Sequence, residues 1–267
     1  MKPPTPLKTQ VKVAAKAGGL VATTLGLLAP FSAERAILKT LADGETRAEV
    51  SRQRWVRRWS RSLLRLFGVH DTCIGGLPHN HRGALVVANH RSAADIGLLL
   101  AHTGGALVSR ADLAGWPVIG LAARSVGTLF VDRGDVHSGV ETIRRIAARL
   151  QGGGVVCLFP EGTTFVGDDV RPFHAGAFLA AKQAGVPIIP AGIAYETGSE
   201  LAFVGETFPA HVKRVAAGKG ARVVLALGAP IEAKGPAAKL ALQAHDAVAD
   251  LVKLARERVD AQPPPTK

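Results

Sequence analysis

Residues 84–95 read Ala-Leu-Val-Val-Ala-Asn-His-Arg-Ser-Ala-Ala-Asp, and the fold is inferred from them outward. The first five are continuously apolar, which is typical of a strand buried on both faces of a parallel sheet. Polar residues begin where that strand should end, and a helical pattern over 94–102 follows. The stretch predicts a β-strand whose carboxyl end leads through a polar loop into a helix.

The same alternation of strand and helix continues along the chain. We expect strands at 106–109, 128–131, 155–159, 187–194 and 222–227, and helices at 136–151, 172–184 and 237–259. Pro187 and Pro190 cannot donate backbone hydrogen bonds, so we expect their strand to lie near an edge or a bulge. This pattern predicts an α/β fold with a mainly parallel central sheet and helices on both faces.

Composition restricts the classes of partner. The chain has 267 residues and a net charge of +12, so we expect a full core and an anionic partner. Aromatic residues make up only 5% of the chain, with one tyrosine, which disfavours the stacking surfaces of single-strand nucleic acid binders. Without a helix-turn-helix, zinc-finger or RNA-binding signature, we expect no nucleic acid partner.

The two cysteines, Cys73 and Cys157, have neither the number nor the spacing of a disulfide framework or a zinc site. Their usage favours a reducing compartment. Cys157 lies in an apolar run, so we interpret it as a small buried side chain rather than a nucleophile. We expect no metal site.

The N-terminal region has two features of a membrane-associating segment. An apolar stretch over 18–31 follows several lysines, but it is shorter than the ~20 residues that span a bilayer as a helix. We therefore expect a re-entrant or interfacial segment. Over 55–67, Trp55 and Trp59 share one face of a predicted helix and arginines occupy the other. Such a helix suits an anionic membrane surface, although it could equally pack its apolar stripe on the domain.

His90 and Asp95 are the first candidate catalytic residues. A turn between them would let the Asp95 carboxylate contact one ring nitrogen of His90 and leave the other free to act as a base. Alone, the pair is weak, because Asp95 could cap a helix and His90 could be an ordinary loop residue.

Two further strand ends carry polar groups. Arg133 follows the strand at 128–131 and could bind a phosphate through its paired donors, or form a surface ion pair. The strand at 155–159 leads into Phe159-Pro160-Glu161-Gly162-Thr163, which has a carboxylate, a glycine and a hydroxyl in one turn. A turn or capping role is the alternative.

Four ordered blocks resemble the glycerolipid acyltransferase superfamily, specifically bacterial 1-acyl-sn-glycerol-3-phosphate acyltransferases. The blocks match Asn-His-x-x-x-x-Asp, Gly-x-x-Phe-x-x-Arg, Phe-Pro-Glu-Gly-Thr and Val-Pro-x-x-Pro. The matching residues are Asn89, His90 and Asp95; Gly127, Phe130 and Arg133; Phe159, Pro160, Glu161, Gly162 and Thr163; and Val186, Pro187 and Pro190.

The resemblance implies a fatty acyl transfer to the free hydroxyl of a lysophospholipid, most simply 1-acyl-sn-glycerol 3-phosphate. The donor would be acyl-CoA or acyl-acyl carrier protein, with no bound cofactor. His90 and Asp95 would be catalytic. The residues expected to bind substrate are Asn89, Arg110, Arg133, Phe159, Pro160, Glu161, Gly162 and Thr163. Alternatives are another lysolipid such as a lyso-ornithine lipid, a noncatalytic membrane-binding module, and a thioesterase.

Residues 1–67 would then form the membrane-interface segment, 68–260 the acyltransferase domain, and 261–267 a disordered tail. We expect the protein on the cytoplasmic face of the inner membrane. Two positions differ from the resembled pattern. Arg110 replaces a frequent lysine and keeps its charge. Thr164 replaces a frequent arginine, whose charge Arg171 or Arg91 could supply.

Overall fold

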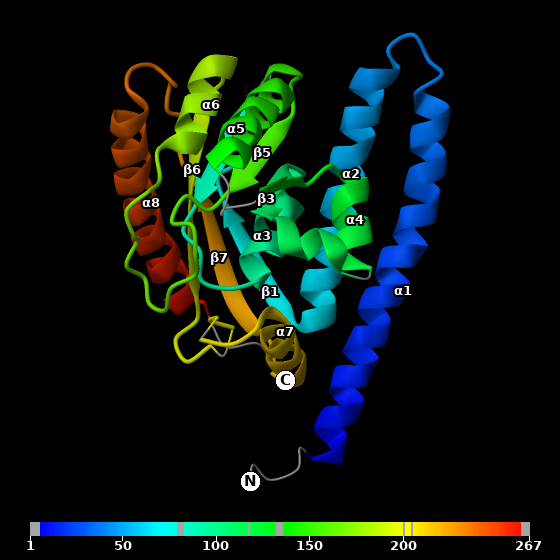
Figure 1. Cartoon of the computed structure of the whole chain (residues 1–267). Helices are drawn as coiled ribbons and strands as arrows, with labels where there is room; N and C mark the ends of the chain where they lie inside the picture. Colours follow the sequence, from blue (N-terminus) through cyan, green and yellow to red (C-terminus); the bar gives the residue numbers. More distant parts are fainter. Residues whose placement is uncertain are drawn as a thin grey trace.

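The computed structural model describes residues 6–78, 83–116, 118–131, 136–199, 201–203 and 205–262, without the side chains of Asp112 and residues 136–138. Its centre is a seven-stranded sheet in the order β1-β7-β6-β2-β5-β3-β4 (Figure 1). The strands are β1 (Val69–Ile74), β2 (Ala84–Ala88), β3 (Ala106–Arg110), β4 (Leu129–Val131), β5 (Val155–Leu158), β6 (Ile188–Tyr195) and β7 (Ala221–Leu227). Each neighbouring pair is parallel except β6 and β7, so the predicted mainly parallel sheet is confirmed.

Helices cover both faces of this sheet, also as predicted. They are α1 (Leu7–Leu38), α2 (Gly44–Phe67), α3 (Ala94–Thr103), α4 (Ile119–Ser125), α5 (Val136–Gln151), α6 (Gly176–Ala184), α7 (Phe208–Ala217) and α8 (Ala237–Asp260), with a 3-10 turn at Ala111–Gly115. Val86 packs with α2 and α3 side chains, and its neighbour Leu85 packs with side chains of α5, α6 and α8. Because successive strand residues point to opposite faces, β2 is apolar throughout.

Three details differ from the expectations. Strand β6 is central rather than at an edge. On its β7 side, Pro190 lies between the Ile188–Ile231 and Ala191–Leu227 pairs, where pairing is interrupted, whereas on its β2 side Pro190 pairs with Val87. Helix α6 begins at Gly176 rather than at 172, because the preceding loop bonds elsewhere: the His174 amide donates to the Pro160 carbonyl. Strand β1 and helices α4 and α7 were not predicted.

The N-terminal apolar segment lies in helix α1, which is longer than the sequence predicted. It is continuous through Pro30 and runs for 32 residues, so shortness no longer argues against a membrane span. By length and composition it could cross a membrane, and little of its apolar window is buried. On its packed side, Lys12 donates to the Gly218 carbonyl and Lys16 to the Phe67 carbonyl.

Helix α2 corrects the expected orientation of its tryptophans. The Trp55 indole donates to Glu34 and the Trp59 indole donates to Thr24, both on α1. The apolar stripe of α2 therefore packs against α1 and α3, as the alternative reading held. The exposed side of α2 carries a basic stripe, formed by Arg47, Arg54, Arg58, Arg61 and Arg65.

The exposed apolar side chains of α1 are consequently the better candidates for membrane contact. Val21 is 39% exposed and Leu25 is 47% exposed. Leu242 on α8, at the other face of the sheet, is 63% exposed and provides a control position. Replacing Val21 and Leu25 together with Asn should weaken liposome binding by at least about tenfold, because less apolar area enters the bilayer. Cosedimentation at high salt measures this without the contribution of the arginines.

Leu242→Asn is the control and should bind liposomes like the wild type. Both variants should keep the wild-type melting temperature, since the replaced side chains are exposed. Unchanged liposome binding by the Val21/Leu25 variant would contradict a membrane role for this face of α1.

Candidate active site

The predicted polar blocks gather at one edge of the sheet. Strands β2, β5, β3 and β4 are mutually parallel, so their carboxyl ends lie side by side. His90 follows β2, Phe159 follows β5, and Arg110 ends β3. Arg133 lies outside the described residues, so its position is not part of this geometry. Functional loops of α/β proteins usually lie at this edge, beyond the carboxyl ends of the strands.

His90 and Asp95 meet as the sequence predicted. The Nδ1 atom of His90 lies 2.9 Å from Oδ2 of Asp95, which sits in the first turn of α3. A carboxylate only accepts, so Nδ1 carries the proton and Nε2 presents a lone pair. The His90 side chain is 17% exposed and Asp95 is fully buried. One nitrogen is thus fixed and the other is left to act as a base.

The Asp95 carboxylate is held from three further directions. Its Oδ2 accepts from the backbone amides of Arg91 at 2.6 Å and Ser92 at 2.8 Å. Its Oδ1 accepts from the Tyr195 hydroxyl at the end of β6. Burial raises the pKa of Tyr195 well above its usual value, so the phenol stays protonated and donates. Sequence reasoning missed Tyr195, although it is the only tyrosine in the chain.

Phe159 stacks on the imidazole of His90. The ring centroids are 3.8 Å apart and the planes differ by 8°. This contact restricts rotation of the imidazole, so His90 is oriented both in its plane and perpendicular to it.

Glu161 connects the loop after β5 to the loop after β2. Its Oε2 accepts from the His90 amide at 2.7 Å and its Oε1 accepts from the Arg171 amide at 2.8 Å. Burial raises the pKa of Glu161. Pro160 is buried beside it, and Gly162 turns the chain at a φ of 78°, a conformation that favours glycine. Thr163 is exposed.

Asn89 is buried, and its side-chain amide forms two hydrogen bonds with β6. Its Nδ2 donates to the Ile193 carbonyl at 3.0 Å, and its Oδ1 accepts from the Ile193 amide at 2.8 Å. Its amide therefore joins the end of β2 to the middle of β6.

The cations near the site differ in their exposure. Arg110 is exposed at the end of β3. Arg91 forms an ion pair with Asp168 and is only 12% exposed. Arg171 is exposed, with its guanidinium 4.9 Å from the centre of the Phe165 ring. Of the two arginines considered as replacements for the missing charge at Thr164, Arg171 is the accessible one.

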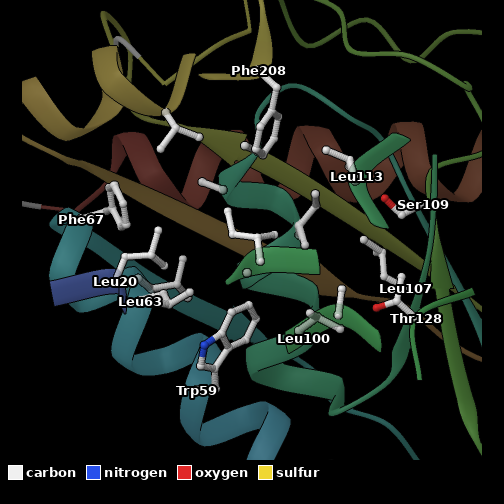
Figure 2. A pocket seen from close by; sticks show the side chains of 18 of the residues that line it. Leu20, Trp59, Leu63, Phe67, Leu100, Leu107, Ser109, Leu113, Thr128 and Phe208 are labelled. Carbon is white, nitrogen blue, oxygen red and sulfur yellow. The ribbon is translucent and has the colours of Figure 1, made fainter. Parts of the chain in front are cut away.

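An apolar cavity of about 190 Å³ opens beside this site (Figure 2). Its walls come from α1, α2, α3, β3, α4 and α7. The labelled lining residues are Leu20, Trp59, Leu63, Phe67, Leu100, Leu107, Ser109, Leu113, Thr128 and Phe208. Ala93 and Ala94 also line it, so the cavity reaches the turn that joins His90 to Asp95. It was not predicted, because its walls come from segments far apart in the sequence.

Comparison with known proteins gives a consistent result. Residues 72–194 match the acyltransferase family model. The chain is 35% identical over 238 residues to the lyso-ornithine lipid O-acyltransferase of Pseudomonas aeruginosa, covering 86% of this chain and 88% of that protein. It is 32% identical over 155 residues to the 1-acyl-sn-glycerol-3-phosphate acyltransferase of Neisseria meningitidis, covering 57% and 60%.

The fold also matches a solved structure. The crystal structure of the 1-acyl-sn-glycerophosphate acyltransferase PlsC from Thermotoga maritima aligns with a TM-score of 0.67 and 20% identity, over 97% of this chain and 98% of that one. This likeness concerns the fold and includes the two N-terminal helices.

The contacts of Asn89 generate a stability prediction. Asn89→Ala should lower the free energy of unfolding by at least about 1 to 3 kcal/mol, because the Ile193 amide and carbonyl lose their buried partners. Denaturant unfolding measures the change. Thr163→Ala, an exposed position in the neighbouring turn, should stay within about 0.5 kcal/mol of the wild type. A stable Asn89→Ala protein with a raised Michaelis constant would instead assign Asn89 to substrate binding.

Proposed function

The chain belongs to the acyltransferase family, and from that membership we propose that it transfers a fatty acyl group from a thioester carrier to the free hydroxyl of a lysolipid. The observation that carries the proposal is the His90–Asp95 contact of 2.9 Å beside an apolar cavity. A base and a site for a hydrocarbon chain are the two requirements of this reaction.

In the proposed mechanism, Nε2 of His90 accepts the proton of the acceptor hydroxyl as its oxygen attacks the thioester carbonyl. The tetrahedral intermediate then expels the thiolate, which takes the proton back from the imidazolium and leaves as a thiol. Asp95 stabilises the imidazolium between these steps. The acceptor alcohol takes the place that a serine has in hydrolases, so no covalent acyl-enzyme forms.

The fatty acyl chain occupies the apolar cavity in this proposal. Ala93 and Ala94 line the cavity and also belong to the catalytic turn, which would bring the thioester end of the chain close to His90. The donor is acyl-CoA or acyl-acyl carrier protein. We propose that no bound cofactor takes part, because the carrier provides the only group that has to leave.

Two acceptors are proposed. A lyso-ornithine lipid is favoured by the relative from Pseudomonas aeruginosa, which matches this chain over nearly its full length. The absence of an arginine at Thr164 agrees with a headgroup other than phosphate. 1-acyl-sn-glycerol 3-phosphate is the second candidate, supported by the relatives that match about half of the chain. Exposed Arg110, with Arg133, Gly162 and Thr163, would contact the acceptor in either case.

We propose a different role for Asn89 and Glu161 from the direct substrate binding that the sequence predicted. The polar atoms of both side chains bond to the protein backbone around His90. We propose that they position the catalytic loop and that substrate contacts come from Phe159 and the exposed groups. The lipid substrates place the enzyme at a membrane surface, which we propose is the cytoplasmic face of the inner membrane.

An acyl-transfer assay with labelled acyl-CoA and both lysolipids tests the reaction and the acceptor together. We expect product from the lyso-ornithine lipid, and a loss of about 100-fold to 10,000-fold in rate for His90→Ala, because a positioned base is removed. Asp95→Asn should also be severe. A folded His90→Ala protein that keeps more than about a tenth of the rate would reject the base. Release of free fatty acid with neither acceptor consumed would identify a thioesterase.

The cavity generates a prediction about donor chain length. Ala123 on α4 lines the cavity, whereas Leu121 on the same helix is 42% exposed and does not. Ala123→Phe should shift the preference towards shorter acyl chains, by roughly fourfold in kcat/KM for each methylene that loses its place. Leu121→Phe should leave the chain-length profile unchanged. An unchanged profile for Ala123→Phe would place the acyl chain elsewhere.

A further inference from the structure

The turn between His90 and Asp95 is held by a second histidine from outside the matched motif. The amides of Arg91 and Ser92 donate to Asp95, and the next amide, that of Ala93, donates to Nε2 of His211 at 3.3 Å. His211 lies on α7, more than a hundred residues along the chain, and is fully buried. Successive amides of one turn are thus shared between Asp95 and His211.

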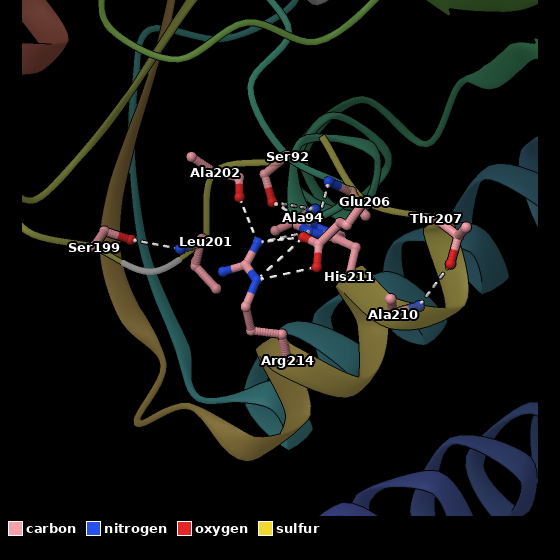
Figure 3. A network of polar contacts seen from close by, with 11 residues as sticks. Ser92, Ala94, Ser199, Leu201, Ala202, Glu206, Thr207, Ala210, His211 and Arg214 are labelled. Carbon is pink, nitrogen blue, oxygen red and sulfur yellow. Dashed lines mark hydrogen bonds and ion pairs between the residues drawn. The ribbon is translucent and has the colours of Figure 1, made fainter. Parts of the chain in front are cut away.

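The other side of the His211 ring contacts the ion pair between Glu206 and Arg214 (Figure 3). Its Nδ1 lies 3.0 Å from Oε1 of Glu206, and Arg214 contacts the same carboxylate at 2.5 Å. Arg214 also donates to the Ala202 carbonyl at 2.6 Å, which anchors the segment before α7. Nη2 of Arg214 also lies 3.1 Å from Nδ1, but the Ala93 amide needs a lone pair on Nε2 and the Glu206 carboxylate needs a donor. Nδ1 therefore carries the proton and donates to Glu206, and Nε2 accepts from Ala93.

The surroundings keep His211 in the form that this contact requires. The charged groups near its ring are Glu206 and Arg214 from the α7 region and Asp95 from α3. Burial lowers the pKa of His211, with Arg214 acting in the same direction, so the ring is neutral at physiological pH. A neutral imidazole can accept at Nε2, whereas an imidazolium cannot.

Ser92, His211 and Glu206 resemble a nucleophilic triad in their order of contact, but the geometry opposes that role. Ser92 is fully buried, and its hydroxyl lies 3.5 Å from Nε2 of His211. The Ser92 oxygen already accepts from the Ala94 amide at 3.1 Å, a local turn that serine side chains often form with the backbone. Ser92 is buried, and Nε2 of His211 already accepts from a backbone amide, so the serine cannot be activated or reach an acyl donor.

We propose that His211 is a positioning residue for acyl transfer: it fixes the Ala93 amide, and through that turn it sets the geometry of His90 and Asp95. The inference rests on the proposed function. Small displacements of a catalytic base lower turnover because the reacting atoms no longer meet at attack distance. Affinity for the acceptor depends on other contacts and should be spared, whereas His211 also lines the cavity proposed for the acyl chain.

Two substitutions test the contacts of the two His211 ring nitrogens separately. The amide of His211→Gln can reach the position of Nε2 and accept from Ala93. The amide of His211→Asn matches Nδ1, so it can donate to Glu206 but leaves the Ala93 amide unpaired. We expect kcat to fall at least about tenfold in His211→Asn and less than about threefold in His211→Gln, with the Michaelis constant for the acceptor unchanged. Ser92→Ala removes the acceptor of the Ala94 amide in the same turn, so it should lower kcat in part but keep far more transfer than His90→Ala.

Hydrogen exchange at the Ala93 amide provides a readout that does not depend on the substrate. Exchange should be slow in the wild type and in His211→Gln, and faster in His211→Asn. Absence of acyl transfer by the wild type would refute the proposed function, whereas the exchange result would still test the contact. Equal losses of kcat in both variants, or loss of all transfer in folded Ser92→Ala, would overturn the positioning role.

Discussion

The buried carboxylate of Asp95 is the interaction on which the site depends. It receives four hydrogen bonds, from the His90 ring, two backbone amides and the Tyr195 hydroxyl. A fully buried charge is costly unless its hydrogen bonds are satisfied, so each of these donors has to stay in place. The requirement links the end of β2, the first turn of α3 and the end of β6.

The surrounding strands keep this arrangement rigid. Asn89 joins β2 to β6 through the Ile193 backbone, and Glu161 joins the β2 loop to the β5 loop through the His90 amide. Phe159 then limits rotation of the imidazole by stacking. These residues of the family motif therefore hold His90 and its loop in place. If His90 is the base, as we propose, its fixed orientation means that little rate is lost to reorganisation.

Sequence reasoning predicted the parts that depend on local pattern. Apolar runs marked the β2 to β7 strands, and the residues after β2 and β5 marked the catalytic edge. It did not predict Tyr195 or His211, because each lies about a hundred residues from its partner and has no neighbouring motif. It also left open whether Trp55 and Trp59 face the membrane or the protein. Amphipathic spacing identifies the apolar face of a helix but does not say whether protein or lipid covers it.

The most direct test of this account is the tautomer of His90, measured by nitrogen NMR on protein with labelled histidines and assigned by comparison with His90→Ala. We predict that neutral His90 carries its proton on Nδ1, directed at Asp95, with an unprotonated Nε2. In Asp95→Asn this preference should weaken, because the amide can also present a donor to the ring. A wild-type spectrum with the proton on Nε2 would contradict the account, since a protonated Nε2 could not take the proton of the lysolipid hydroxyl.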